Sequence, residues 1–237
     1  MRIATINISG NVGKTTIATN LLYPRLPGAL VCEFETVNTG LQLKSASIKT
    51  MRASSFGSMI DSIMLAESAI IDVGASNIEG FFKEMQELDG SHEDIDYFLI
   101  PVVKDEKIIK ESVKTALLLS GLGVNRDKIK MVFNRFPKDL ELQDVFAPIF
   151  KIAKNDGKFT AHKSAVIYEN PVYAELNKLQ ISLQELNADT TDYRAKLRDT
   201  SDEKEQKACL AMIANKRRSA SASQNLDEVF SALFGKE

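Results

Sequence analysis

A stretch near the amino end, residues 6–16, has the residue types and spacing of a phosphate-binding loop. It reads INISGNVGKTT. Gly10 and Gly13 allow the backbone to curl so that successive N–H groups, including those of Asn11 and Val12, point at one anion. An apolar run precedes the loop and a helical pattern follows it, which is the strand–loop–helix order that such a loop requires.

The residues that follow the second glycine add charge and a hydroxyl. Lys14 can reach the terminal phosphates, and the Thr15 hydroxyl can ligate Mg²⁺. Thr16 belongs to the first turn of the helix, and the partial positive charge at a helix start favours an anion. The general pattern has a further glycine five positions before Gly13, where this chain has Ile8. The alternative is a glycine-rich turn that carries GKTT by chance.

Two expected strands end in carboxylates. Asp72 closes the run IID, at the position of the second magnesium-side acid of P-loop enzymes. Glu33 and Glu35 flank Phe34 at an earlier strand end, and strand alternation places both on one side, where Glu35 can polarise an attacking water. The alternative for each acid is a solvated side chain at a strand tip.

The segment after a later strand bears on the choice of base. It reads Asn134-Arg135-Phe136-Pro137, with an asparagine but without the aspartate by which GTPases read guanine. An amide can pair with the adenine edge through one donor and one acceptor. We therefore expect Asn134 and Arg135 at an ATP site, with a turn before Pro137 as the alternative.

Apolar runs and helical spacing alternate along the first part of the chain. The pattern predicts an α/β P-loop NTPase with a mostly parallel sheet and helices on both faces. Strands are expected over residues 3–8, 29–34, 68–74, 97–103 and 130–133, and helices over 17–22, 59–65, 78–88 and 106–122, with a loop and short-helix region at 36–58.

The pattern is weaker in the last hundred residues. Residues 146–152 fit a strand or a helix, and 165–171 fit a strand or a loop that returns to the sheet. Helical spacing then predicts C-terminal helices at 172–186, 202–216 and 227–234, with a polar stretch at 187–201 and a small-residue linker at 219–223. We divide the chain into a P-loop ATPase domain, 1–186, and a C-terminal helical extension, 187–237.

Composition sets limits on the protein's class. The chain has 237 residues, of which 44% are hydrophobic, and this is enough to form a full core. Its net charge is −2, so no overall positive charge indicates a nucleic-acid partner. Cys32 and Cys209 form no metal or disulfide pattern, and no signal peptide or membrane-length apolar run is evident. These features predict a cytoplasmic protein.

The ordered motifs resemble the ParA/MinD family of Walker-type ATPases and, more narrowly, the plasmid-stability StbB proteins. The resemblance rests on SGNVGKTT, CEFETVN, SAIIDVG, YFLIPVVKD and MVFNRF. It implies ATP and Mg²⁺ as ligands, dimers that sandwich nucleotide, slow hydrolysis, and the positioning of plasmids, chromosomes or division proteins. It further implies that Lys14 holds the β and γ phosphates, Thr15 and Asp72 the magnesium, Glu35 the attacking water and Asn134 the adenine.

Two features differ from the family's pattern, one in the loop and one in the switch acids. The signature lysine before the paired glycines falls on Ser9, and the second glycine of the pair falls on Asn11. That lysine reaches the partner subunit's phosphates, so its replacement removes the usual dimer contact. The acids of the family's switch after the second strand are Glu33 and Glu35 here and not aspartates. Their longer side chains position a water less well, which favours slow hydrolysis.

The sequence thus favours an ATPase for plasmid partition, positioning or stable inheritance, working with a DNA-binding adaptor and, through ATP, as a homodimer. Nonspecific DNA contact has candidates in two basic groups on the extension, with an ordinary solvated surface as the alternative because nine basic residues after Ala188 are balanced by nine acids. The last helix has an apolar face but carries acids, so membrane binding is not favoured. Two alternatives stay open: an ATP-dependent ligase of dethiobiotin-synthetase type and a nucleotide-dependent scaffold that does not hydrolyse ATP. The basic groups are Lys216, Arg217 and Arg218, and Arg194, Lys196 and Arg198.

Overall fold

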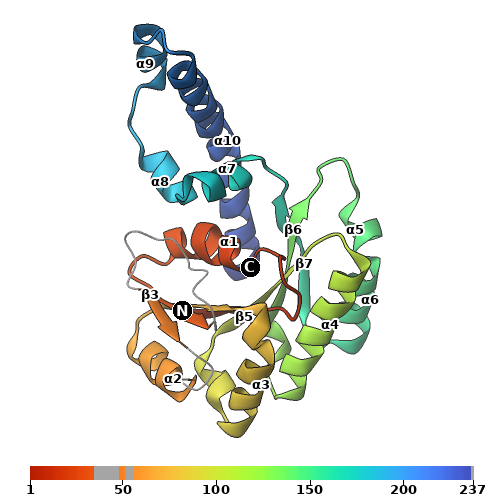
Figure 1. Ribbon diagram of the computed structural model, residues 1–237. Helices are drawn as coiled ribbons and strands as arrows, with labels where there is room; N and C mark the ends of the chain where they lie inside the picture. Colours follow the sequence, from red (N-terminus) through yellow and green to blue (C-terminus); the bar gives the residue numbers. More distant parts are fainter. Residues whose placement is uncertain (35–47, 52–55, 236–237) are drawn as a thin grey trace.

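The strands form one parallel sheet. The structure, a computed structural model, describes residues 1–34, 48–51 and 56–235. Within these ranges the sheet has seven strands in the order β3-β2-β4-β1-β5-β6-β7, with every neighbouring pair parallel (Figure 1). Their bounds are β1 Arg2–Thr5, β2 Leu30–Phe34, β3 Ile48–Met51, β4 Ala69–Val73, β5 Tyr97–Val102, β6 Ile129–Phe136 and β7 Thr160–Tyr168.

Helices cover both faces of this sheet, and each face has its own apolar core. One face carries α2 Phe56–Leu65, α3 Ile78–Glu87, α4 Glu106–Gly121, α5 Leu142–Val145 and α6 Ala147–Asp156, and short 3₁₀ turns lie at Ala75–Asn77, Ser91–Asp94 and Arg126–Lys128. The other face carries α1 Lys14–Ile17, which continues through π-type turns at Ala18–Leu22 and a 3₁₀ turn at Tyr23–Arg25, together with α7 Val172–Leu179, α8 Leu183–Ala188 and part of α10 Glu203–Phe234. The predicted α/β class with a parallel sheet is confirmed.

Several predicted bounds change. The first strand ends at Thr5 and not at residue 8, because the Asn7 side chain turns to bond the carbonyl of Pro101 and begins the loop. The ambiguous stretch 146–152 is helical and belongs to α6, while 165–171 contains the end of strand β7. The strand β3 lies inside the stretch expected to be a loop and short-helix region.

The helical spacing at 172–186 proves to be two helices. Gln180, with a φ of 54°, ends α7, and Ser182 begins α8 with a capping box that it shares with Glu185. The polar stretch that follows contains a further helix, α9 Tyr193–Asp199, whose N-cap Asp192 accepts from two backbone amides.

The predicted linker at 219–223 is wrong. Residues 203–234 form one continuous helix, α10. Small side chains there serve packing, since Ser219 and Ala222 are buried and allow α10 to approach the sheet closely. Beyond them Leu226, Val229 and Leu233 enter the second core.

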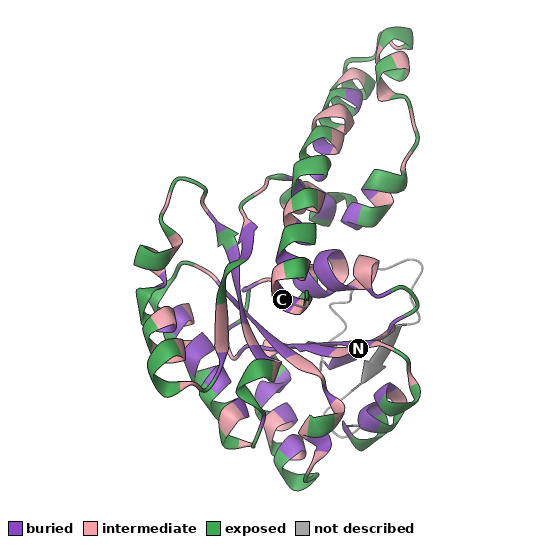
Figure 2. Ribbon diagram, turned by 180° about the vertical axis from the view of Figure 1, so that it is seen from behind, coloured by how far each residue is buried: buried purple, intermediate pink, exposed green. Residues whose placement is uncertain are grey.

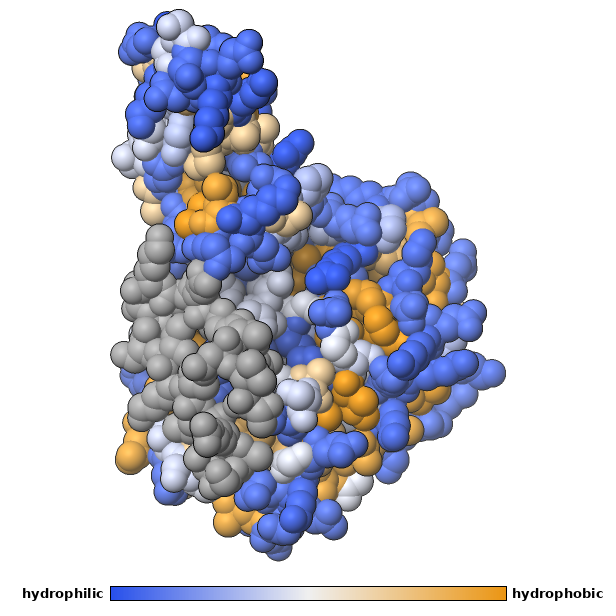
Figure 3. All heavy atoms as spheres, in the orientation of Figure 1, coloured by the Kyte–Doolittle hydropathy of each residue, from blue (hydrophilic) through white to orange (hydrophobic). Residues whose placement is uncertain are grey.

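The amino-terminal half of α10 leaves the body of the molecule. Figure 1 shows this half and α9 projecting together, and we call this part, residues 189–217, the arm. Its surface is mostly exposed in Figure 2 and mostly hydrophilic in Figure 3. Among the described helices, none combines the length and the hydropathy that crossing a bilayer demands.

Candidate functional site

The loop predicted to bind phosphate connects β1 to α1, and two of its residues have left-handed backbone. Asn11 has a φ of 57° and Gly13 a φ of 91°. A Cβ on Gly13 would lie 2.3 Å from the Asn134 side-chain nitrogen, so this position requires glycine. At Gly10, which was expected to share this role, the backbone is not left-handed, and an added Cβ would meet only Ala75 at 3.9 Å.

Lys14 is held inside the loop. Its side chain is buried, and Nζ donates to the carbonyl oxygens of Asn7 at 3.2 Å and Ser9 at 2.9 Å. The ammonium group therefore lies across the loop from the helix start, where a bound phosphate would meet both the charge and the loop amides.

Asp72 and Thr15 meet at the ends of neighbouring elements. The Thr15 hydroxyl donates to one carboxylate oxygen of Asp72 at 2.6 Å, and the Thr5 hydroxyl donates to the other at 2.9 Å. Burial raises the pKa of Asp72 to about 6, against the opposing hydrogen bonds from the two threonines and the charge of Lys14, while Glu33 adds to the rise. The sequence contains no signal for Thr5, which the register of β1 and β4 places opposite Asp72.

These two oxygen-bearing side chains suit a magnesium ion that also binds phosphate. Mg²⁺ usually takes one or two protein oxygens and completes its shell with phosphate oxygens and waters. Within residues 1–34, 48–51 and 56–235, no group of three or more His, Cys, Asp or Glu side chains could hold a metal on its own. Thr15 and Asp72 fit the nucleotide-dependent type of site.

The structure describes only one of the two switch glutamates, Glu33. Glu33 is buried at the end of β2, beside Asp72 in the register of β2 and β4. Glu35, the residue expected to orient the attacking water, lies outside the described residues and its role stays a prediction.

Helix α4 holds the first half of the loop through contacts that sequence reasoning missed. The Asn7 amide donates to Ser112 at 2.8 Å, and the Ile8 backbone N–H donates to the Thr115 hydroxyl at 3.2 Å. Ser9, at the place of the family's signature lysine, donates its hydroxyl to the Glu111 carboxylate. A carboxylate thus lies beside the loop where the family resemblance implies a cation.

Asn134 lies against the loop. Its side-chain nitrogen donates to the Val12 carbonyl at 2.8 Å, and its oxygen accepts from the Arg135 backbone N–H at 2.9 Å. The residue is buried, so in this structure its amide secures the loop. Arg135 follows with a φ of 51° at an irregularity in the pairing of β6 and β7, and its side chain is exposed.

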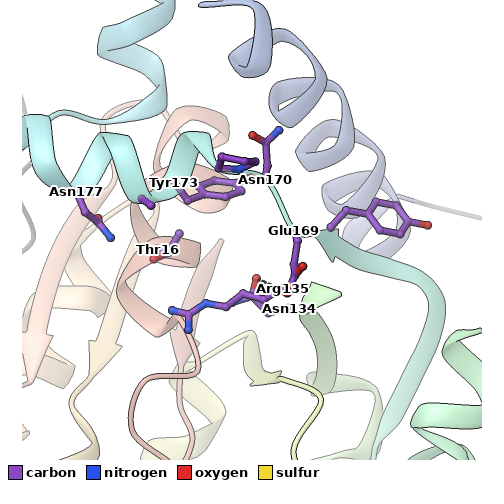
Figure 4. Close-up of a pocket in the computed structure, with 10 residues that line it drawn as sticks. Thr16, Asn134, Arg135, Glu169, Asn170, Tyr173 and Asn177 are labelled. Carbon is purple, nitrogen blue, oxygen red and sulfur yellow. Dashed lines mark hydrogen bonds between the residues drawn. The ribbon is translucent and has the colours of Figure 1, made fainter. Parts of the chain in front are cut away.

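A cavity of about 560 Å³ opens beside Asn134 and Arg135. In Figure 4 the Arg135 side chain extends across it toward the helix that carries Thr16. The opposite wall is the segment between β7 and α7, which sequence reasoning did not connect with the site. Its lining residues are Thr16, Asn134, Arg135, Tyr168, Glu169, Asn170, Pro171, Tyr173, Ala174 and Asn177.

Comparisons with known proteins give likeness in structure only. The sequence matches no protein-family description and no curated protein. Solved structures do resemble it. The MinC:MinD cell division complex of Aquifex aeolicus has a TM-score of 0.61 at 13% identity and covers 100% of this chain and 96% of that chain.

Two further structures agree with this result and were solved with nucleotide. The complex of a Cyanothece McdA variant with ATP has a TM-score of 0.55 at 14% identity, covering 100% of this chain and 97% of its own. The Pyrococcus horikoshii septum site-determining protein MinD with Mg-ADP has a TM-score of 0.56 at 13% identity, covering 97% and 94%. The loop, the paired Thr15 and Asp72, and the cavity beside Asn134 therefore lie on the P-loop fold that MinD and McdA share.

Proposed function

We propose that this chain is an ATPase of the ParA/MinD type, which binds ATP with Mg²⁺ and hydrolyses it slowly. The observation that carries the proposal is the arrangement of Lys14, Thr15 and Asp72. A buried ammonium spans the loop, and a hydroxyl and a carboxylate meet 2.6 Å apart at the helix start. This set can bind the β and γ phosphates and the metal that bridges them.

The cavity beside Asn134 is the proposed site of the base and ribose. It begins at Thr16, in the helix that starts at the phosphate loop, so a nucleotide bound at the loop would extend into it. We propose that Arg135 lies along the nucleotide and that the Asn134 amide, which lines the cavity and also donates to the Val12 carbonyl, meets the adenine edge.

Nucleotide binding can be tested by calorimetry with Mg-ATP and Mg-ADP. Lys14→Ala removes charge-assisted hydrogen bonds to phosphate and should weaken affinity about tenfold to a hundredfold. Asp72→Asn should reduce the gain in nucleotide affinity that Mg²⁺ provides, and should change the affinity for nucleotide without Mg²⁺ less. Lys83→Ala on α3, whose side chain is exposed, is the matched control. Unchanged affinity in Lys14→Ala would refute the proposal.

The biological role that we propose is the partition, positioning or stable inheritance of a plasmid, as the StbB-like motifs suggest. We propose a DNA-binding adaptor as partner and an ATP-dependent homodimer. Light scattering with and without Mg-ATP, on the wild type and on Glu35→Gln, tests the dimer. A mass that doubles only with ATP supports it, and a monomer under all conditions rejects it.

Direct DNA contact is the finer part of this proposal. The basic residues of both groups lie on the arm, except Arg218, which follows it directly, and Arg194, Lys216 and Arg217 line one cavity there. Lys216 also lies 3.7 Å from the Asp189 carboxylate, which offsets part of the charge. Binding to duplex DNA that weakens steeply with salt, and is lost in an Arg217→Ala, Arg218→Ala variant, would support the contact.

The non-hydrolysing scaffold is favoured by one observation, the hydrogen bond from Ser9 to Glu111. It puts a carboxylate where the family resemblance implies a lysine that neutralises phosphate charge. Turnover separates the two functions: equal and negligible ATP hydrolysis by the wild type and Glu35→Gln would favour the scaffold.

A further inference from the structure

Helix α10 bonds directly to the wall of the proposed base pocket. The Asn225 side chain accepts from the Tyr168 backbone N–H at 3.0 Å and donates to the Val166 carbonyl at 2.8 Å. From the pocket side, the Asn170 amide donates to the Arg218 carbonyl at 3.3 Å and to the Ser221 hydroxyl at 3.4 Å. Since Tyr168 and Asn170 line the cavity, this part of α10 fixes the position of the pocket wall.

The same part of α10 is attached to the helix that follows the phosphate loop. Arg25 donates from Nε and Nη2 to the Asp227 carboxylate at 3.0 and 2.6 Å. Its Nη1 donates to the carbonyls of Asn20 and Leu21 at 3.1 and 2.9 Å, and so caps the end of that helix. Arg25 also lies over the ring of Phe230, 6.0 Å from its centroid.

A third connection joins the pocket to α8. The Asn20 side chain donates to the carbonyl of Thr16, which lines the cavity, and accepts from the Leu183 backbone N–H at 2.9 Å. The chain runs from α8 directly into the arm. Both ends of the proposed nucleotide site therefore contact elements that continue into the arm.

Residues 203–217 of the arm belong to α10 itself. Residues 203–234 are one helix, so a tilt of its buried half also moves its projecting half. At the projecting end, α9 and its connection rest on α10 through Tyr193, whose hydroxyl donates to Asp189 at 2.7 Å and whose ring lies 5.3 Å from the Lys216 ammonium. Figure 1 shows α9 beside α10 and away from the sheet.

We propose that residues 218–227 of α10 read nucleotide occupancy from both the pocket wall and the phosphate-loop helix, and that the arm is moved or stiffened in response. Asn170, Asn225 and Arg25 act as positioning residues. The inference rests on the proposed nucleotide site. Because coupling between two sites is reciprocal, anything that binds the arm preferentially in one nucleotide state changes nucleotide affinity by the same factor.

The test is hydrogen exchange of the full chain with and without saturating Mg-ADP, read separately on the phosphate loop and on residues 193–212. In the wild type we expect exchange to change in both segments, by about fivefold or more in the arm. In a variant with Asn170→Ser and Asp227→Asn, the loop response should remain and the arm response should fall by about twofold or more. It should not vanish, because the Asn225 and Asn20 hydrogen bonds still connect the pocket to the arm. An arm response equal to that of the wild type would contradict the role of these two residues. Serine can still accept from the Val172 N–H, as Asn170 does, but is too short to reach α10.

Two controls keep the inference falsifiable. Glu87→Gln removes an exposed ion pair on α3, Lys83 to Glu87 at 3.6 Å, and should leave both responses intact. Asp227→Glu, in the Asn170 wild-type background, should retain the arm response. A wild-type arm that exchanges identically with and without Mg-ADP, while the loop is protected, overturns the inference alone. If neither segment responds and calorimetry shows no binding, the proposed function fails as well.

Discussion

At the scale of single residues, the most informative group is Asp72, whose carboxyl is buried between two hydroxyl donors and close to Glu33. Water is excluded from the carboxylate, which disfavours its charged form. Ionisation of this buried carboxyl therefore costs stability, and the divalent cation of the proposed function, bound at Thr15 and Asp72, would offset that cost.

This cost predicts a dependence of stability on pH. Because the pKa of Asp72 rises from 3.8 to about 6 on folding, the folded state holds a proton that the unfolded state releases between these values. The free energy of unfolding of the metal-free protein should therefore decline as pH rises from about 4 to about 6, by up to about 3 kcal/mol.

Urea denaturation of Asp72→Asn, compared with the wild type at pH 7 and at pH 4, measures this contribution. The variant should be the more stable protein at pH 7, and the difference should shrink at pH 4. A variant less stable than the wild type at both pH values would contradict the predicted penalty.

The two loop glycines give a second prediction. Gly13→Ala places a methyl group 2.3 Å from the Asn134 amide in a left-handed conformation, which should cost about 1–2 kcal/mol from the backbone alone and weaken Mg-ATP binding. Gly10→Ala would make only an ordinary contact with Ala75 at 3.9 Å and should stay within about 0.5 kcal/mol of the wild type. Equal effects of the two substitutions would show that the difference in backbone conformation is unimportant.

At the scale of elements, α10 shows how tertiary contacts override local sequence. The run SASAS reads as a linker because serine is a poor helix former, yet Ser219 and Ala222 are small enough to pack closely and the helix continues. Ala220→Pro, at an exposed position of this helix, should cost about 3 kcal/mol or more in thermal or urea denaturation.

The matched control is Thr190→Pro, in the non-helical connection between α8 and α9. Its melting temperature should stay near that of the wild type. Equal tolerance of the two prolines would mean that 219–223 is a linker after all.

Sequence reasoning succeeded where the signal is local. The strand before GKTT, the strand that carries Asp72 and the strand at 130–133 were each located, because apolar runs and turn residues are close in sequence, although β1 ends earlier than expected and β6 continues through Asn134 to Phe136. It missed β3, a short strand that exists only by pairing with β2, and α9, a helix of seven residues in a polar stretch.

The site divides in the same way. The loop residues follow from spacing, whereas Thr5, Glu111 and the pocket wall at 168–171 reach the site only through the fold. Glu111 lies 102 positions from Ser9 in the sequence, so no local pattern marks it. The adenine role of Asn134 remains a prediction, since its amide is already bonded to the loop.

At the scale of the whole molecule, the division into residues 1–186 and 187–237 can be tested by truncation. Leu226, Val229 and Leu233 of the extension are buried against the second face of the sheet. Burial of three such side chains contributes about 5–9 kcal/mol, comparable with the total stability of a typical domain.

A chain that ends at residue 186 should therefore be insoluble or partly unfolded, as circular dichroism and exclusion chromatography would show. A chain that lacks only 193–199, with α9 replaced by a flexible glycine-serine loop, should keep its fold. A folded and soluble 1–186 fragment would show that the extension is dispensable for the core.

The two hydrogen bonds between Asn225 and β7 have a consequence for solubility. Among the strands that the structure describes, β7 is the last in the sheet, so one side of it has a row of backbone donors and acceptors that none of those strands pairs. Such a row invites a strand from another molecule and, with it, aggregation. The Asn225 amide bonds Val166 and Tyr168 as a neighbouring strand would, and α10 packs along β7. The helix thereby covers part of this edge and should hinder self-association there.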